Sequence, residues 1–216
     1  MKLPSQFLAW TAAATVLALA ASFVALRAEP ESQREVVALE SLYSEPATHL
    51  GRSFRVRFQV RGECAEWNPY LTRFGAAEYR AFDVWSDSQF LWDKEQWDAP
   101  LGRCFVRRGG IAERTLEGAP RLSRIEAVVT VRQVFLGRPW FEVESARRIV
   151  DELGESTLLH ASRGYEAFLE GRWTAARERF DQALVGSMPE ALRTELRRLR
   201  ESTLQPHSND TRREQR

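Results

Sequence analysis

The chain has 216 residues, of which 44% are hydrophobic and 28% are charged. Its 31 basic and 30 acidic residues leave a formal net charge of +1. This balance argues against a protein whose main role is to bind nucleic acid, because such proteins usually carry a strongly basic surface. The length is sufficient for one domain of ordinary size and a small appendage.

The segment Phe7–Leu26 contains twenty consecutive residues without a charge. A helix of that length spans the ~30 Å hydrocarbon layer of a bilayer at ~1.5 Å per residue. Lys2 precedes the segment, whereas Arg27 is followed by acidic residues, so the positive-inside rule places the N-terminus in the cytoplasm. We therefore expect residues 1–28 to be a signal-anchor or a signal peptide.

An uncleaved anchor predicts a single-pass membrane protein of the cell envelope, with its folded part in the periplasm or otherwise outside the cytoplasm. Cleavage at the small residues Ala18-Leu19-Ala20 would instead give a secreted protein. The apolar run continues past that site to Leu26, which favours retention.

The exported part contains two cysteines, Cys64 and Cys104. An oxidising compartment would allow them to form a disulfide. The alternative is a free buried thiol, because Cys104 lies in the apolar run Arg103–Val106. The histidines and cysteines lack the spacing of a metal site, so no metal or other cofactor is expected.

Residues 35–150 have the pattern of a β-rich domain with a short leading helix at Glu35–Tyr43. The clearest strand is Phe54–Arg61, in which apolar and polar residues alternate strictly. Four further strands are predicted, at Arg80–Ser86, Arg103–Arg107, Ile125–Leu136 and Trp140–Ile149. The last two are separated by Gly137-Arg138-Pro139, which indicates a hairpin.

This series of five strands, with a long connection after the third and a terminal hairpin, resembles the OB-fold barrel over residues 51–149. Another small barrel or sandwich is the alternative. The predicted fold class is α+β, consisting of an N-terminal hydrophobic helix, a small five-stranded OB-like β-barrel, and a C-terminal α-helical hairpin with a capping helix.

Small and aromatic residues occupy particular positions within Thr157–Leu184, on both sides of a glycine turn. The set is Gly164, Gly171, Trp173, Ala176, Phe180 and Ala183. This pattern resembles one tetratricopeptide (TPR) repeat, a pair of packed helices. His160, Arg163 and Ala167 depart from the family's pattern in the first helix.

A third helix is predicted after Ser187-Met188-Pro189-Glu190, which has the pattern of a capping box. Its leucines Leu192, Leu196 and Leu199 lie at helical spacing. A single repeat cannot bury its own core, so residues 155–204 are expected to dock on the barrel, on a second copy or on a partner. We expect residues 205–216 to form a disordered tail.

Aromatic residues crowd the irregular stretches beside the first barrel strand. They are Trp67, Tyr70, Trp85, Trp92 and Trp97. OB-like barrels bind oligonucleotides or oligosaccharides on such a face, and outside the cytoplasm a glycan or a peptide is the expected ligand, with no role for nucleic acid. The competing interpretation is that these rings seal the barrel and the repeat interface.

Sequence motifs of nucleophilic hydrolysis and phosphate binding are missing, and solvation of loops accounts for the acidic cluster around Asp83, Asp87 and Asp93. The sequence therefore predicts a non-enzymatic protein–protein interaction module, tethered to the membrane or exported. The alternative is an exported barrel that binds a glycan or a peptide through its aromatic loop face.

Overall fold

The computed structural model describes residues 35–68 and 71–204. Within these ranges no helix is long and apolar enough to span a bilayer. The predicted anchor Phe7–Leu26, Tyr70 and the C-terminal tail 205–216 lie outside the described residues, so the expectations for them stay predictions.

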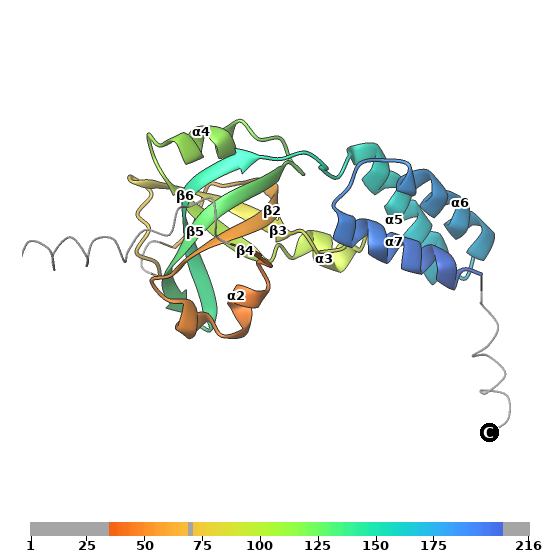
Figure 1. Cartoon of the computed structure of the whole chain (residues 1–216), viewed down its shortest axis with the longest axis horizontal. Coiled ribbons are helices and arrows are strands. Elements are labelled where there is room, and N and C mark those ends of the chain that lie inside the picture. Colours follow the sequence, from red (N-terminus) through yellow and green to blue (C-terminus); the bar gives the residue numbers. More distant parts are fainter. Residues whose placement is uncertain (1–34, 69–70, 205–216) are drawn as a thin grey trace, which may run out of the picture. The chain divides into compact units, whose positions relative to one another are not determined.

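Five strands form a closed mixed β-barrel (Figure 1). They are β2 (Ser53–Cys64), β3 (Tyr79–Ser86), β4 (Gly102–Arg107), β5 (Arg124–Phe135) and β6 (Arg138–Arg148). The strand order is β2-β3-β4-β6-β5, and β5 pairs back to β2 to close the barrel. The β4–β6 pair is parallel and the other barrel pairs are antiparallel. All five predicted strands are present, and the barrel is consistent with the expected OB-like architecture.

The apolar residues of the alternating strand fill the barrel interior. Val56, Phe58 and Val60 are at most 1% exposed. They lie opposite residues of β5 and β3 that also point inward, such as Ile125 opposite Phe58 and Val84 opposite Val60. Because successive side chains of a strand point to opposite faces, the intervening residues reach the outer surface of the barrel.

Short helices cover the two ends of the barrel (Figure 1). Helix α4 (Ile111–Glu117) buries Ala112 and Leu116 against one end, in a stretch where the sequence predicted only a connection. At the other end, Leu39 and Leu42 pack into the same core beside α2 (Ser41–Ser44) and the 3-10 helix η2 (Pro46–His49).

The prediction of a leading helix at Glu35–Tyr43 was wrong for the first half of that segment. Val36 and Val37 form a short strand, β1, parallel to β2, and the helix begins only at Ser41. Valine is β-branched and packs well on a sheet, so pairing with the exposed edge of β2 overrides the helical spacing.

The β5–β6 hairpin turns at Leu136 and Gly137, which both have positive φ angles, of 49° and 72°. Two successive positive φ angles match the right-handed twist of the flanking strands. Pro139 already belongs to β6, where it pairs with Val134. The predicted hairpin is therefore confirmed, with its turn one residue earlier than the Gly-Arg-Pro run suggested.

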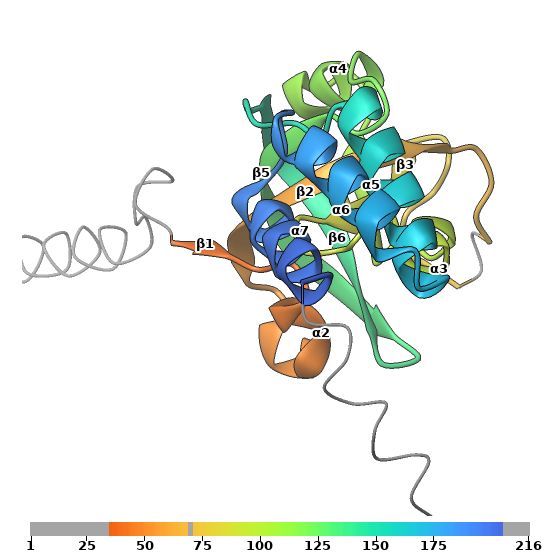
Figure 2. The same ribbon diagram turned by 90° about the vertical axis from the view of Figure 1, so that its right-hand side faces the viewer.

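Three helices follow the barrel: α5 (Glu155–Leu169), α6 (Trp173–Leu184) and α7 (Glu190–Ser202) (Figure 2). Helices α5 and α6 form a hairpin and pack tightly against each other at Gly164. A Cβ atom at Gly164 would lie 2.6 Å from the Phe180 ring, so only glycine allows the two helices this spacing. Ala161 and Ala176 are fully buried in the same core cluster.

Leu192, Leu196 and Leu199 of α7 are buried, as their helical spacing predicted. The predicted capping box does not form, because Pro189 is the N-cap residue and no side chain caps the helix. Proline lacks an N–H group and fixes φ, which suits the start of a helix without a polar cap.

The apolar surface of the helices packs against the connection between β3 and β4, which contains the short helix α3 (Lys94–Asp98). Leu91 and Trp92 of this connection, with Trp85 of β3, share one buried cluster with the helical leucines. The helical segment thus has an intramolecular docking surface, which was one of the three possibilities that the sequence left open.

An ion-pair cluster joins three strands on the outside of the barrel. Glu126 of β5 lies opposite Arg57 of β2 and Arg147 of β6. Arg57 donates to its carboxylate at 2.9 and 3.0 Å, and Arg147 at 2.6 and 3.1 Å. Burial opposes ionisation of Glu126, but the hydrogen bonds from both arginines outweigh it and lower its pKa.

Replacing Gly164 with leucine should destabilise the helical hairpin. The larger side chain overlaps the Phe180 ring, and overpacking of this kind costs about 1–3 kcal/mol. Urea unfolding measures the loss. Arg163→Leu is the matched control, because Arg163 is exposed on the same helix. Equal stability of Gly164→Leu and the control would contradict the close packing.

Glu126→Gln should lower the free energy of unfolding at pH 7 by about 1–3 kcal/mol, because charge-assisted hydrogen bonds are lost. The pKa of Glu126 is lowered in the folded state, so its contribution is present above the ordinary carboxyl pKa and disappears as the pH falls through the lowered value. The difference between wild type and variant should therefore shrink toward low pH in urea titrations. A difference that is constant from pH 7 to pH 2.5 would contradict this account.

Candidate functional site

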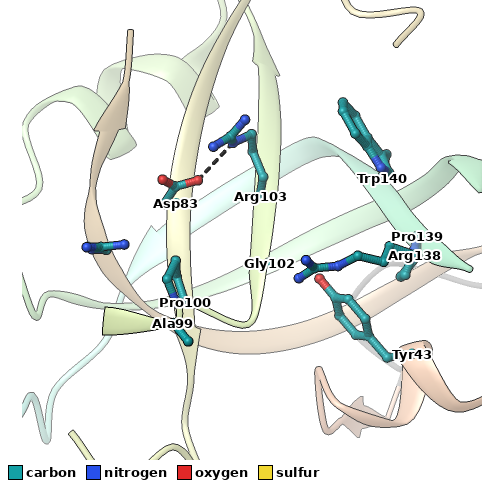
Figure 3. A pocket seen from close by; sticks show the side chains of 10 residues that line it. Tyr43, Asp83, Ala99, Pro100, Gly102, Arg103, Arg138, Pro139 and Trp140 are labelled. Carbon is teal, nitrogen blue, oxygen red and sulfur yellow. Dashed lines mark hydrogen bonds and ion pairs between the residues drawn. The ribbon is translucent and has the colours of Figure 1, made fainter. Parts of the chain in front are cut away.

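A pocket of about 490 Å³ lies on the outer face of β3 and β4 (Figure 3). We call it the barrel pocket. Its polar and aromatic walls come from four strands and from helix α2. They are Tyr43, Arg61, Asp83, Arg103, Arg138 and Trp140.

A β-bulge places Arg61 at the rim of this pocket. Val60 pairs with Val84 and Gly62 with Asp83, so Arg61 is an extra residue with no partner in the β2–β3 ladder. A bulge bends the strand and redirects a side chain. The Arg61 guanidinium lies 5.9 Å from the centroid of the Trp85 ring.

Tyr43 and Arg138 form the opposite wall, where their polar groups lie close together (Figure 3). A Cβ atom at Gly102 would overlap the Tyr43 hydroxyl, so glycine at this position of β4 allows the ring to approach. Arg138 donates to the Leu101 carbonyl at 2.7 Å. Burial raises the pKa of Tyr43, which keeps its phenol protonated at neutral pH.

The charges of the barrel pocket do not balance. Arg103 donates to Asp83 at 2.8 Å, and this pair is drawn in Figure 3. Arg61 and Arg138 have no carboxylate partner among the described residues. The pocket therefore has three guanidinium groups and one carboxylate on its walls.

Trp140 forms the aromatic wall and is held from behind by stacked rings. It stacks on Phe105 with centroids 5.4 Å apart, and Phe105 stacks on Phe74 at 4.2 Å. The Trp67 indole N–H donates to the Phe74 carbonyl at 2.7 Å, which fixes the loop between β2 and β3 on this cluster. The Trp140 ring is half-buried, so part of it faces solvent.

The five aromatic residues singled out from the sequence lie in different places. Trp67 belongs to the stacked cluster behind Trp140, and Tyr70 lies outside the described residues. Trp85 and Trp92 are 0% and 5% exposed, within the cluster that includes the helices, and Trp97 stacks on Trp85 at 4.7 Å.

A second cavity of about 480 Å³ lies between the β3–β4 connection and α5. We call it the loop–helix pocket. Trp92 and Trp97 line it together with Leu122, Leu158 and Leu159. Its charged rim is mixed, with Lys94 and Arg121 on the connecting segments and Glu155 and Glu166 on α5. Two of the predicted aromatic residues therefore meet in one pocket, although this is not the barrel pocket.

The sequence did not single out Tyr43, Arg61, Arg138 or Trp140 as ligand-binding residues. Arg138 and Trp140 flank Pro139 directly after the hairpin turn, a position where an exposed tryptophan and an arginine would have been a usable signal. Arg61 is one of the polar residues of the alternating strand predicted at Phe54–Arg61, and only the bulge distinguishes it from the others.

Cys64 and Cys104 are free thiols in this structure. Cys104 is buried in the barrel interior beside Phe82, whereas Cys64 packs on the outer cluster with Ala81 and Phe105. They therefore lie on opposite faces of the sheet, and the disulfide that the sequence allowed is not formed. Burial raises the pKa of the Cys104 thiol to about 12.

Comparisons with known proteins do not identify a family for this chain. No protein-family model and no curated protein matches the chain. A solved structure described as an aspartyl-tRNA synthetase from Leishmania major Friedlin aligns with 79% of this chain and 37% of that chain, at 10% sequence identity and a TM-score of 0.38. The chain thus spans little more than a third of that protein's length, and a likeness at this level establishes neither a shared fold nor a shared activity. Within residues 35–68 and 71–204, no group of three or more metal-ligating side chains is present.

The two thiols should differ sharply in reactivity. Cys64 is half-exposed, whereas Cys104 is fully buried with a raised pKa, and the thiolate is the reactive form. Titration with a thiol reagent at pH 8 should modify one cysteine in the native protein and two after denaturation. Two unreactive cysteines in the denatured, unreduced protein would show a disulfide and contradict the structure.

Proposed function

We propose that this chain is a non-enzymatic binding protein whose barrel holds a glycan or a peptide in the barrel pocket. The observation that supports this most is the joint presence there of a half-buried indole and of guanidinium groups without carboxylate partners. Binding sites of small molecules are concave, have volumes of roughly 300–1,000 Å³ and combine aromatic walls with a few convergent polar groups.

The position of the pocket agrees with an OB-like barrel. Counting β2 as the first barrel strand, β3 and β4 are the second and third, and helix α4 lies between the third and fourth. OB-folds bind their ligands across the second and third strands and the neighbouring loops. The barrel pocket opens on that face, beside the β5–β6 hairpin.

The proposed location follows from the N-terminal segment. A signal-anchor at residues 7–26 would hold the barrel at the outer surface of the membrane, and cleavage would release it as a secreted protein. In either case the ligand comes from outside the cytoplasm, which supports a glycan or a peptide over nucleic acid. The site needs no cofactor to bind such a ligand.

Trp140→Ala should weaken ligand binding by the barrel pocket. Loss of the ring removes the aromatic wall, and we expect affinity to fall at least about tenfold, which corresponds to ~1.4 kcal/mol. A glycan array and a peptide array probed with residues 29–216 measure retention. Trp67→Ala is the control, because Trp67 packs in the same aromatic cluster without lining the pocket. Retention that is lost in the control but kept in Trp140→Ala would contradict the proposal.

The second candidate function is protein–protein interaction through a TPR-like helical module, with another protein or a second copy of the chain. The observation that favours it is the loop–helix pocket, whose apolar wall includes the 49%-exposed side chain of Leu159. Helical repeats use such surfaces to hold partner segments. The apolar face of the helices already packs on the β3–β4 connection, so a partner is not needed to stabilise the module.

Leu159→Arg should remove any protein partner that binds at the loop–helix pocket, because a charge replaces its apolar wall. Leu169→Arg is the matched control on the same helix, since Leu169 is 68% exposed and does not line the pocket. Cross-linking followed by pull-down from detergent-solubilised envelopes measures partner recovery. Equal recovery by wild type and Leu159→Arg would rule out this surface.

A further inference from the structure

Several arginines elsewhere on the barrel are neutralised by carboxylates. Arg57 and Arg147 share Glu126, and Arg124 pairs with Asp87. Arg80 at the end covered by α4 contacts three glutamates, Glu63, Glu113 and Glu117. These pairs leave little net positive field on those surfaces, since opposite charges in contact largely cancel at a distance.

The barrel pocket departs from this pattern. Among the described residues that line it, Asp83 is the one carboxylate, and it pairs with Arg103. The charges of Arg61 and Arg138 therefore stay uncompensated on two sides of one concavity. Walls of low dielectric strengthen the attraction that such a concavity exerts on an anion. Guanidinium groups also bind carboxylate and phosphate in bidentate geometry.

We propose that the ligand of the barrel pocket is an acidic glycan, whose carboxylate or phosphate groups are bound by Arg61 and Arg138 while a sugar ring lies on Trp140. This inference rests on the proposed binding function and adds the charge of the ligand to it. For sugar hydroxyls, the Asp83 carboxylate supplies a hydrogen-bond acceptor and the Tyr43 hydroxyl supplies a donor.

The other polyanions fit less well. Single-stranded nucleic acid needs a basic groove that follows its backbone and several aromatic platforms for successive bases. Here several of the barrel arginines are paired with carboxylates, and Trp85 and Trp92 are buried. An acidic peptide would use the two arginines, but it would also place a ring on Trp140 only if an aromatic or proline residue lay beside its acidic residue, whereas every unit of an acidic glycan carries a ring.

Isothermal titration of residues 29–216 with two acidic probes, tetragalacturonate and a phosphorylated mannotetraose, tests the inference. Each has a neutral counterpart of the same backbone, methyl-esterified tetragalacturonate and mannotetraose. At least one acidic probe should bind tenfold or more tightly than its neutral counterpart, and the probe that binds identifies carboxylate or phosphate as the anion. Raising NaCl from 50 to 500 mM should weaken this binding.

Arg138→Gln and Arg61→Gln should each reduce binding of the acidic probe at least tenfold and leave binding of its neutral counterpart unchanged. Arg163→Gln is the control, because Arg163 is exposed on α5, away from the pocket. Unfolding curves in urea show whether each variant is folded. A folded Arg138→Gln variant with wild-type affinity for the acidic probe would overturn the inference.

Other results would also overturn it. One such result is equal affinity for the acidic and neutral probes. Another is that neither kind of probe binds while array ligands are still retained through Trp140. In both cases the proposed binding function would remain, but with a neutral ligand. Tighter binding of hexaglutamate than of either acidic sugar would assign the pocket to a peptide. Tighter binding of hexathymidylate would assign it to nucleic acid. Empty arrays together with no binding of any probe would overturn the proposed function as well.

Discussion

The barrel depends on the double pairing of one strand. Strand β2 pairs through Ser53–Gln59 with β5 and through Phe58–Cys64 with β3, so it closes the sheet on itself. Closure fixes which side chains point inward, because a shift of one residue would turn the apolar set outward. The bulge at Arg61 lies within the β3-paired half of the same strand, and closure therefore also positions this arginine beside the pocket.

The aromatic residues have two structural roles. One stack, Phe74–Phe105–Trp140, attaches the β2–β3 loop to the barrel and supports the pocket wall. In a separate pair, Trp85 of β3 stacks on Trp97 of the β3–β4 connection, where the helices pack. Arg121 lies over Trp97 and donates to the Arg61 carbonyl at 3.2 Å, so the two regions meet at the rims of the two pockets.

The local sequence pattern predicted the five strands, the β5–β6 hairpin and the buried leucines of α7. Alternation and helical spacing depend only on residues that are close together in the chain. Helix α4 was missed because it has only seven residues and is flanked by Gly110 and Gly118, which indicate a loop. The barrel pocket was missed for a different reason. Its walls come from residues as distant as Tyr43 and Trp140, and only the closed topology and one bulge bring them together. Large aromatic side chains drew attention to Trp85 and Trp92, which pack in the core, as the competing interpretation held.

The central claim is that the ligand contacts the β3–β4 face of the barrel through the pocket between Arg61, Arg138 and Trp140. The most direct test is a ¹H–¹⁵N spectrum of residues 29–216, with the indole N–H and arginine Nε–H signals assigned, recorded during titration with a ligand retained on the arrays. The account predicts that the signals of Trp140 and Arg138 shift with saturation while that of buried Trp85 does not. Shifts confined to Trp92 and Trp97, which line the loop–helix pocket, would contradict it.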